Sequence, residues 1–160
     1  MVFSYNDFEK QRRLRLVPKE LQISTIIFAN EESWGFGPGA AETGLIVYEL
    51  PDNIATAIQK KGMSYFTKIE QQANNGYGEC SWCGIYEPWS QTPIKERDTL
   101  QPKKITDFLN NFDGSFSTDS EIDAELNDAI SKSGSYFAHG RSSTLIIMPN
   151  IKKVAFVYAG

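Results

Sequence analysis

The sequence predicts one compact α+β domain over residues 1–160, with a mainly antiparallel sheet, about three to four helices and a C-terminal β-hairpin. Its composition, 41% apolar and 22% charged residues, is typical of a globular protein. A chain of 160 residues buries roughly 68–70% of its surface on folding, so no disulfide or metal is required for a core. Segments that resemble strands and helices follow one another without the strict alternation of a doubly wound fold.

The first predicted element is a short helix over residues 4–15. Ser4 or Asn6 is expected to cap its N-terminus, because short polar side chains accept hydrogen bonds from the first free amides of a helix. Phe8 and Leu14 are its apolar side chains and are expected to face inward.

Two strands and a second helix follow. Residues 21–29 and 45–50 are β-branched and apolar, which predicts strands joined as a hairpin with a long loop over 30–44. Residues 51–61 have helical spacing of apolar side chains, and Gly62 stands where a C-terminal cap belongs.

The middle of the chain is an aromatic-rich excursion over residues 71–102, which contains many Gly, Asn and Pro residues. Its aromatic content favours an ordered, packed segment over a flexible linker. Apolar stripes predict helices over 103–112 and 119–131, the latter capped by Thr118 or Asp119.

The C-terminal region gives the strongest strand pattern. Residues 143–148 and 154–158 are β-branched and apolar, and 149–153 is a short hairpin connection between them. Residues 136–138 are expected to add a strand beside this hairpin.

Charge and hydropathy limit the expected partners. The net charge is −4, and the one basic cluster, around Arg12, Arg13 and Arg15, is more typical of a solvated face than of a nucleic-acid site. No apolar run has the length of a membrane helix, so neither nucleic acid nor membrane is an expected partner. The first residues lack the features of a signal peptide, which makes the cytoplasm the default location.

The glycine-rich loop has two interpretations. A loose G-x-G-x-x-A spacing begins at Gly35, but Pro38 and the strand expected from Leu45 leave no room for the helix of a dinucleotide site. The loop is therefore a long hairpin connection. Alternatively, it is a binding loop that presents Trp34, Phe36 and Glu42.

Cys80 and Cys83 form a C-x-x-C pair in a turn-rich region. Zinc requires four ligands, and the chain has no further cysteine. A thioredoxin-like redox site requires a helix after the pair, and no helix pattern follows here. We therefore expect a structural or incidental pair, with neither metal nor cofactor. A redox pair and a zinc site completed by His139 and a carboxylate are the alternatives.

One enzymatic alternative depends on the only histidine, His139. A histidine base is typical of hydrolases, and Arg141 could bind an anionic group, with Glu42 as a carboxylate in the same cleft. The G-x-S-x-G motif of many hydrolases is absent.

The preferred interpretation is a small non-catalytic binding protein, for instance an acidic neutraliser of a protein partner. Large aromatic side chains outside the regular elements are typical of interface hot spots. The candidate binding residues are Trp34, Phe36, Trp82, Tyr86 and Trp89. Two alternatives remain open: that these aromatic residues fold inward and cap one end of the sheet, and that the chain is a structural protein of a repeating assembly. The sequence does not determine the oligomeric state.

Overall fold

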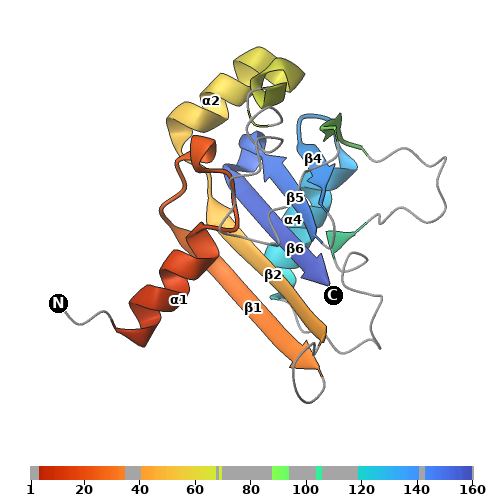
Figure 1. The fold of residues 1–160 in the computed structure, drawn as a ribbon. Helices are drawn as coiled ribbons and strands as arrows, with labels where there is room; N and C mark the ends of the chain where they lie inside the picture. Colours follow the sequence, from red (N-terminus) through yellow and green to blue (C-terminus); the bar gives the residue numbers. More distant parts are fainter. Residues whose placement is uncertain are drawn as a thin grey trace.

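A computed structural model describes residues 4–34, 41–67, 69, 88–93, 104–105, 119–140 and 143–159 (Figure 1). In chain order its elements are α1 (Tyr5–Leu14), η1 (Lys19–Leu21), β1 (Ile26–Trp34), β2 (Ala41–Glu49), α2 (Asp52–Lys61), η2 (Gly62–Phe66), β3 (Ser90–Gln91), α4 (Ser120–Ser131), β4 (Tyr136–His139), β5 (Ser143–Met148), η4 (Pro149–Ile151) and β6 (Lys153–Ala159). The η elements are short 3₁₀ turns.

Within the residues that the structure describes, the strands form one six-stranded sheet in the order β1-β2-β6-β5-β4-β3. Every neighbouring pair is antiparallel, and β5 and β6 form a hairpin through η4. The predicted α+β fold with a mainly antiparallel sheet and a C-terminal hairpin is therefore confirmed.

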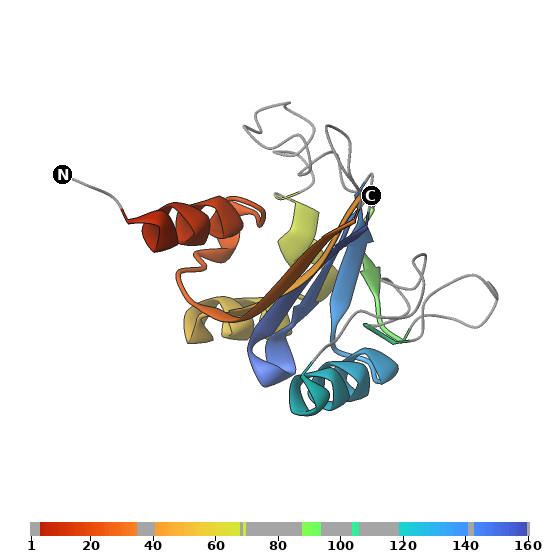
Figure 2. The ribbon, with the colours of Figure 1, turned by 90° about the horizontal axis from the view of Figure 1, so that it is seen from below.

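Alternate side chains of the central strands point to opposite faces of the sheet. Tyr48 and Phe156 lie on a face covered by α2 and η2, which we call the α2 face. Val47 and Val157 lie on the opposite face, which α4 covers and which we call the α4 face (Figure 2). Because both faces are covered, the central strands are apolar throughout instead of alternating with polar residues.

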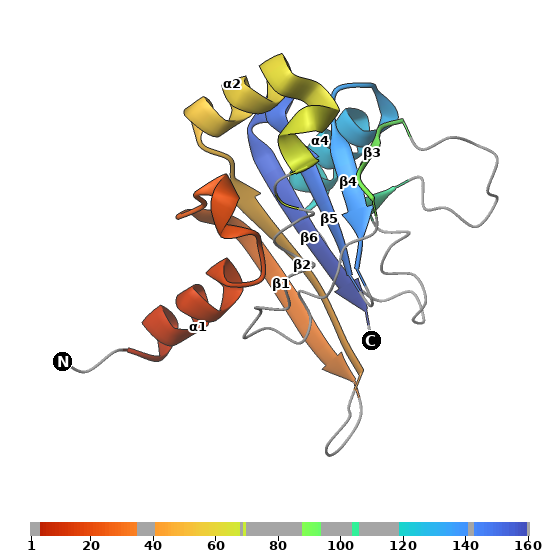
Figure 3. The same cartoon turned by 45° about the horizontal axis from the view of Figure 1, so that its top comes forward.

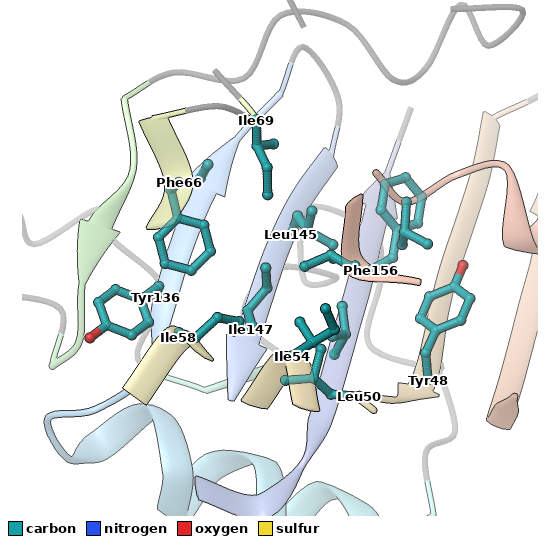
Figure 4. Close-up of a cluster of buried hydrophobic side chains, with 14 of the residues drawn as sticks. Tyr48, Leu50, Ile54, Ile58, Phe66, Ile69, Tyr136, Leu145, Ile147 and Phe156 are labelled. Atoms are coloured by element: carbon teal, nitrogen blue, oxygen red, sulfur yellow. The ribbon is translucent and has the colours of Figure 1, made fainter. Parts of the chain in front are cut away.

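One side of the core on the α2 face is an aromatic cluster around Phe66, which lies near Tyr136 in Figure 4. The ring of Phe66 stacks on Trp89 with centroids 4.3 Å apart, and Tyr136 lies 5.0 Å from the same ring. Ile58 from α2 and Ile147 from β5 are completely buried beside them. Aromatic rings bury a large apolar area, so this cluster ties η2 and the segment before β3 to the sheet.

Predicted helix ends agree well with the structure. The Ser4 side chain accepts a hydrogen bond from the Asp7 amide, and α4 is capped by Asp119. Gly62 follows α2 with φ of 58°, a conformation that glycine adopts readily. The expectation that Phe8 faces inward is wrong. Its side chain is 63% exposed, because charged side chains of α1 contact the sheet instead.

The first strand begins later than predicted. Leu21 belongs to a 3₁₀ turn, and Gln22 has a left-handed φ of 54° that prevents an extended chain there. The predicted hairpin of β1 and β2 is present, but both strands continue into the predicted loop 30–44. Of the helix predicted over 103–112, Ile105 is buried, and most of this segment lies outside the described residues.

We predict that Ile147→Ala lowers the free energy of unfolding by about 2–5 kcal/mol, because a cavity remains in a fully buried site. The matched control is Ile27→Ala, since this side chain is 42% exposed at the edge of the sheet. Urea denaturation measures both. Equal effects of the two substitutions would show that β5 is not central to the core.

Candidate functional site

α1 is attached to the domain in an unusual way for a surface helix. None of its side chains is buried, whereas a surface helix normally covers the core with an apolar stripe. Leu14 at its C-terminal end packs only partly against the core. Leu16, Val17 and Leu21, which follow the helix, are buried. The chain is therefore anchored after α1, while α1 itself depends on polar contacts.

The main polar contact is the carboxylate of Glu31 in β1. Arg12 Nη2 lies 2.8 and 3.0 Å from its two oxygens, and Arg13 Nε lies 2.6 Å from Oε1. Tyr158 in β6 donates its hydroxyl to Oε2. We call these four residues the Glu31 cluster. It joins α1, β1 and β6, which are far apart in the sequence.

Neighbouring residues extend this cluster. Glu9 binds the same guanidinium of Arg12, with Nη2 3.0 Å from Oε2. The Tyr48 hydroxyl donates to the Arg13 carbonyl oxygen at 2.7 Å. Glu31 and Tyr48, two polar side chains of the sheet, therefore hold the last turn of α1.

Gly44 explains how Tyr158 reaches Glu31. Gly44 in β2 pairs with Tyr158 on one side and with Glu31 on the other. A Cβ atom at Gly44 would overlap the Tyr158 ring. The missing side chain therefore lets the ring lie flat across β2 and bring its hydroxyl to the edge strand.

Burial and charge set the protonation of this cluster. Burial alone would raise the pKa of Glu31, but hydrogen bonds from Tyr158, Arg13 and Arg12 outweigh it and lower the pKa below the ordinary glutamate value. Burial and the Glu31 carboxylate raise the pKa of Tyr158. At neutral pH, Glu31 is therefore a carboxylate and Tyr158 is a phenol that donates to it.

Exposed apolar side chains gather on α1. Tyr5 is 77% exposed, and Phe8, one turn later, is 63% exposed. In the described part of the chain, Ile27 and Met63 are the other large apolar side chains with high exposure. We call Tyr5 and Phe8 the arm surface. Figure 3 shows α1 projecting beside β1, away from the body of the sheet.

The hairpin of β1 and β2 extends beyond the other strands. Thr43 pairs with Ala159 at the end of β6, whereas Ser33–Glu42 and Trp34–Ala41 pair only within the hairpin. Among the described strands, β1 has a neighbour on one side only and forms the edge of the sheet.

The structure places two of the five predicted aromatic binding residues. Trp34 ends β1 on the projecting hairpin. Trp89 is 4% exposed and stacks on Phe66, so it packs inward, in agreement with the alternative that these aromatic residues cap the sheet. Phe36, Trp82 and Tyr86 lie outside the described residues.

The residues of the enzymatic alternative are not brought together where they are described. His139 Nδ1 lies 2.9 Å from Thr144 Oγ1, and both residues belong to the α4 face. Glu42 is exposed on the projecting hairpin, on the α2 face and three strands away. Arg141 lies outside the described residues, as does the Cys80–Cys83 pair.

Two further kinds of site, a metal centre and a membrane-spanning helix, have no candidate in the described ranges. No group of three or more His, Cys, Asp or Glu side chains there could hold a metal ion. None of the described helices has the length and apolar character needed to cross a membrane. Comparison of the chain with family models, curated proteins and solved structures found no match.

Sequence reasoning missed the Glu31 cluster and the arm surface. The signal for the cluster was weak, since Glu31 and Glu32 resemble a solvated acidic pair in a loop. Phe8 was assigned to the core because an aromatic side chain in a predicted helix usually faces inward. Only the pairing of β1 with β2 shows that Glu31 lies opposite a glycine.

We predict that Trp89→Ala lowers the free energy of unfolding by about 3–5 kcal/mol, because this ring is buried against Phe66. Met63→Ala is the control, since Met63 is exposed. Urea denaturation of both variants decides the point. A loss below about 1 kcal/mol for Trp89→Ala would contradict its place in the core.

We also predict that Tyr158→Phe lowers stability at neutral pH and makes stability depend less on pH in the acid range. The lowered pKa of Glu31 stabilises the folded state above the unfolded glutamate pKa of about 4.3, and this stability is lost as pH falls through the folded pKa. Removing the hydroxyl raises the folded pKa toward the unfolded value, so the variant has less of this stability to lose and its loss is complete at a higher pH. Urea denaturation from neutral pH to about pH 3 measures it. Superimposable pH profiles would refute the assignment.

Proposed function

We propose that this chain is a non-catalytic binding protein that docks on another protein through α1. The observation that carries this proposal is the exposure of Tyr5 and Phe8 on a helix that buries none of its own side chains. Aromatic side chains in such positions supply much of the energy of protein interfaces. Their exposure without a partner is costly in solubility, which favours a binding role.

The charge around the arm surface indicates the kind of partner. Residues 4–19 contain five basic and two acidic side chains, although the whole chain has a net charge of −4. Glu31 neutralises part of this charge, while Lys10, Arg15 and Lys19 remain exposed. A protein with an apolar pocket and an acidic rim would complement this surface.

A second candidate is the acidic neutraliser of a basic protein, which α4 favours. Glu121, Glu125 and Asp128 are exposed along this helix. Lys132 pairs with Asp128 and Lys153 pairs with Glu125, so only part of the negative charge of α4 is compensated. A basic partner would then bind the side of the domain that α4 covers, opposite the α2 face.

The test uses a photo-crosslinking amino acid in place of Phe8, Asp128 or Met63, each in the full chain expressed in its own cell. We expect a discrete protein adduct from position 8 and none from Met63, which is the exposed apolar control. An adduct from position 128 alone would support the acidic neutraliser instead. Absence of adducts at both 8 and 128 would reject docking at either helix.

A matched pair of substitutions strengthens the test. We predict that Phe8→Ala abolishes the adduct formed by a crosslinker at Tyr5 but shifts the melting temperature by less than about 2 °C, because surface substitutions change stability little. Met63→Ala should leave the adduct intact. If Phe8→Ala instead lowered stability by several kcal/mol, Phe8 would be a packing residue and the proposal would fail.

A further inference from the structure

We propose that α1 is a latched arm: the Glu31 carboxylate holds it against β1, and loss of this contact releases residues 5–14 as a unit while the rest of the domain stays folded. This latch is a property of the free chain, so it is separate from the binding role and does not depend on which partner binds. It concerns how the arm surface is held and when it can move.

The attachments of α1 to the sheet lie at one end of the helix. Contacts from α1 to the sheet converge on its last turn, where Arg12 and Arg13 meet Glu31 and where Tyr48 binds the Arg13 carbonyl. Tyr5 and Phe8, in the first turn, are exposed. A helix held at one end by a few polar groups is a local unit of low stability.

The chain that follows α1 is anchored in the core. Leu16 and Val17 are 7% exposed and Leu21 is fully buried in the core of the α2 face. Arg15, the C-cap of α1, lies between the helix and this anchor. Movement of α1 can therefore stop at Arg15, and the one side chain of α1 that leaves the core is the partly packed Leu14.

The latch joins charged side chains of α1 to charged and polar side chains of the sheet. Arg12 and Arg13 from α1 face Glu31, Tyr158 from β6 donates to it, and Glu9 shares Arg12. Glu42 from β2 acts on Tyr158. One carboxylate thus binds two guanidinium groups, so neutralising Glu31 leaves Arg12 with Glu9 and removes the carboxylate that Arg13 binds in the Glu31 cluster.

A released α1 would lose its protection from solvent. Helices of about ten residues are marginal in water when nothing supports them, so the undocked segment would fray. Its amide hydrogens would then exchange quickly, whereas those of the sheet would not. This difference makes the latch measurable without a partner.

The test compares Glu31→Gln with Glu32→Gln by hydrogen exchange of the full chain at neutral pH. Glu32 is the next residue and points to the opposite face of β1, so it matches the charge change without touching the latch. We expect amides of residues 5–14 to exchange at least about ten-fold faster in Glu31→Gln. Segments in β5 and β6 should stay protected over the same labelling times, and Glu32→Gln should resemble the parent.

A second variant removes the arginines of α1 that bind Glu31. Arg12→Gln combined with Arg13→Gln should release the same residues and speed tryptic cleavage after Arg15, leaving a stable fragment that begins at Leu16. Unchanged exchange of α1 in Glu31→Gln would overturn the proposal. Loss of protection in β5 and β6 together with α1 would overturn it as well, because Glu31 would then support the whole domain.

Discussion

The attachment of the N-terminal region depends on one carboxylate. Glu31 receives hydrogen bonds from two arginines of α1 and from Tyr158 near the end of β6. A half-buried carboxylate is stable only when its neighbours satisfy it, and these donors do so. The exposed positions of Tyr5 and Phe8 follow, because the side of α1 that meets the sheet is charged instead of apolar.

The geometry of the sheet makes this contact possible. Gly44 leaves space on β2, and the Tyr158 ring fills it and carries a hydroxyl from β6 to the edge strand. Cross-strand packing and the Glu31 cluster are therefore linked. A side chain at Gly44 would displace the ring and remove one of the donors to Glu31.

Much of the fold could be predicted from the sequence, because apolar periodicity reports burial directly. Strands 143–148 and 154–158 and the caps at Ser4, Asp119 and Gly62 follow from local patterns. The candidate site could not be predicted in this way. Glu31, Tyr158 and Arg13 meet only through strand register and helix placement, which no local pattern encodes. Phe8 is exposed against expectation, because helix periodicity alone does not show which side of α1 meets the sheet.

The central claim, that Glu31 fastens α1 through its arginines, is tested most directly by a double-mutant cycle. Free energies of unfolding are measured for the parent, Arg13→Gln, Glu31→Gln and the combined variant in one buffer. The account predicts a coupling energy of about 0.5–3 kcal/mol between the two positions. Additive effects, within about 0.5 kcal/mol, would show that the two side chains do not stabilise one another and would contradict the account.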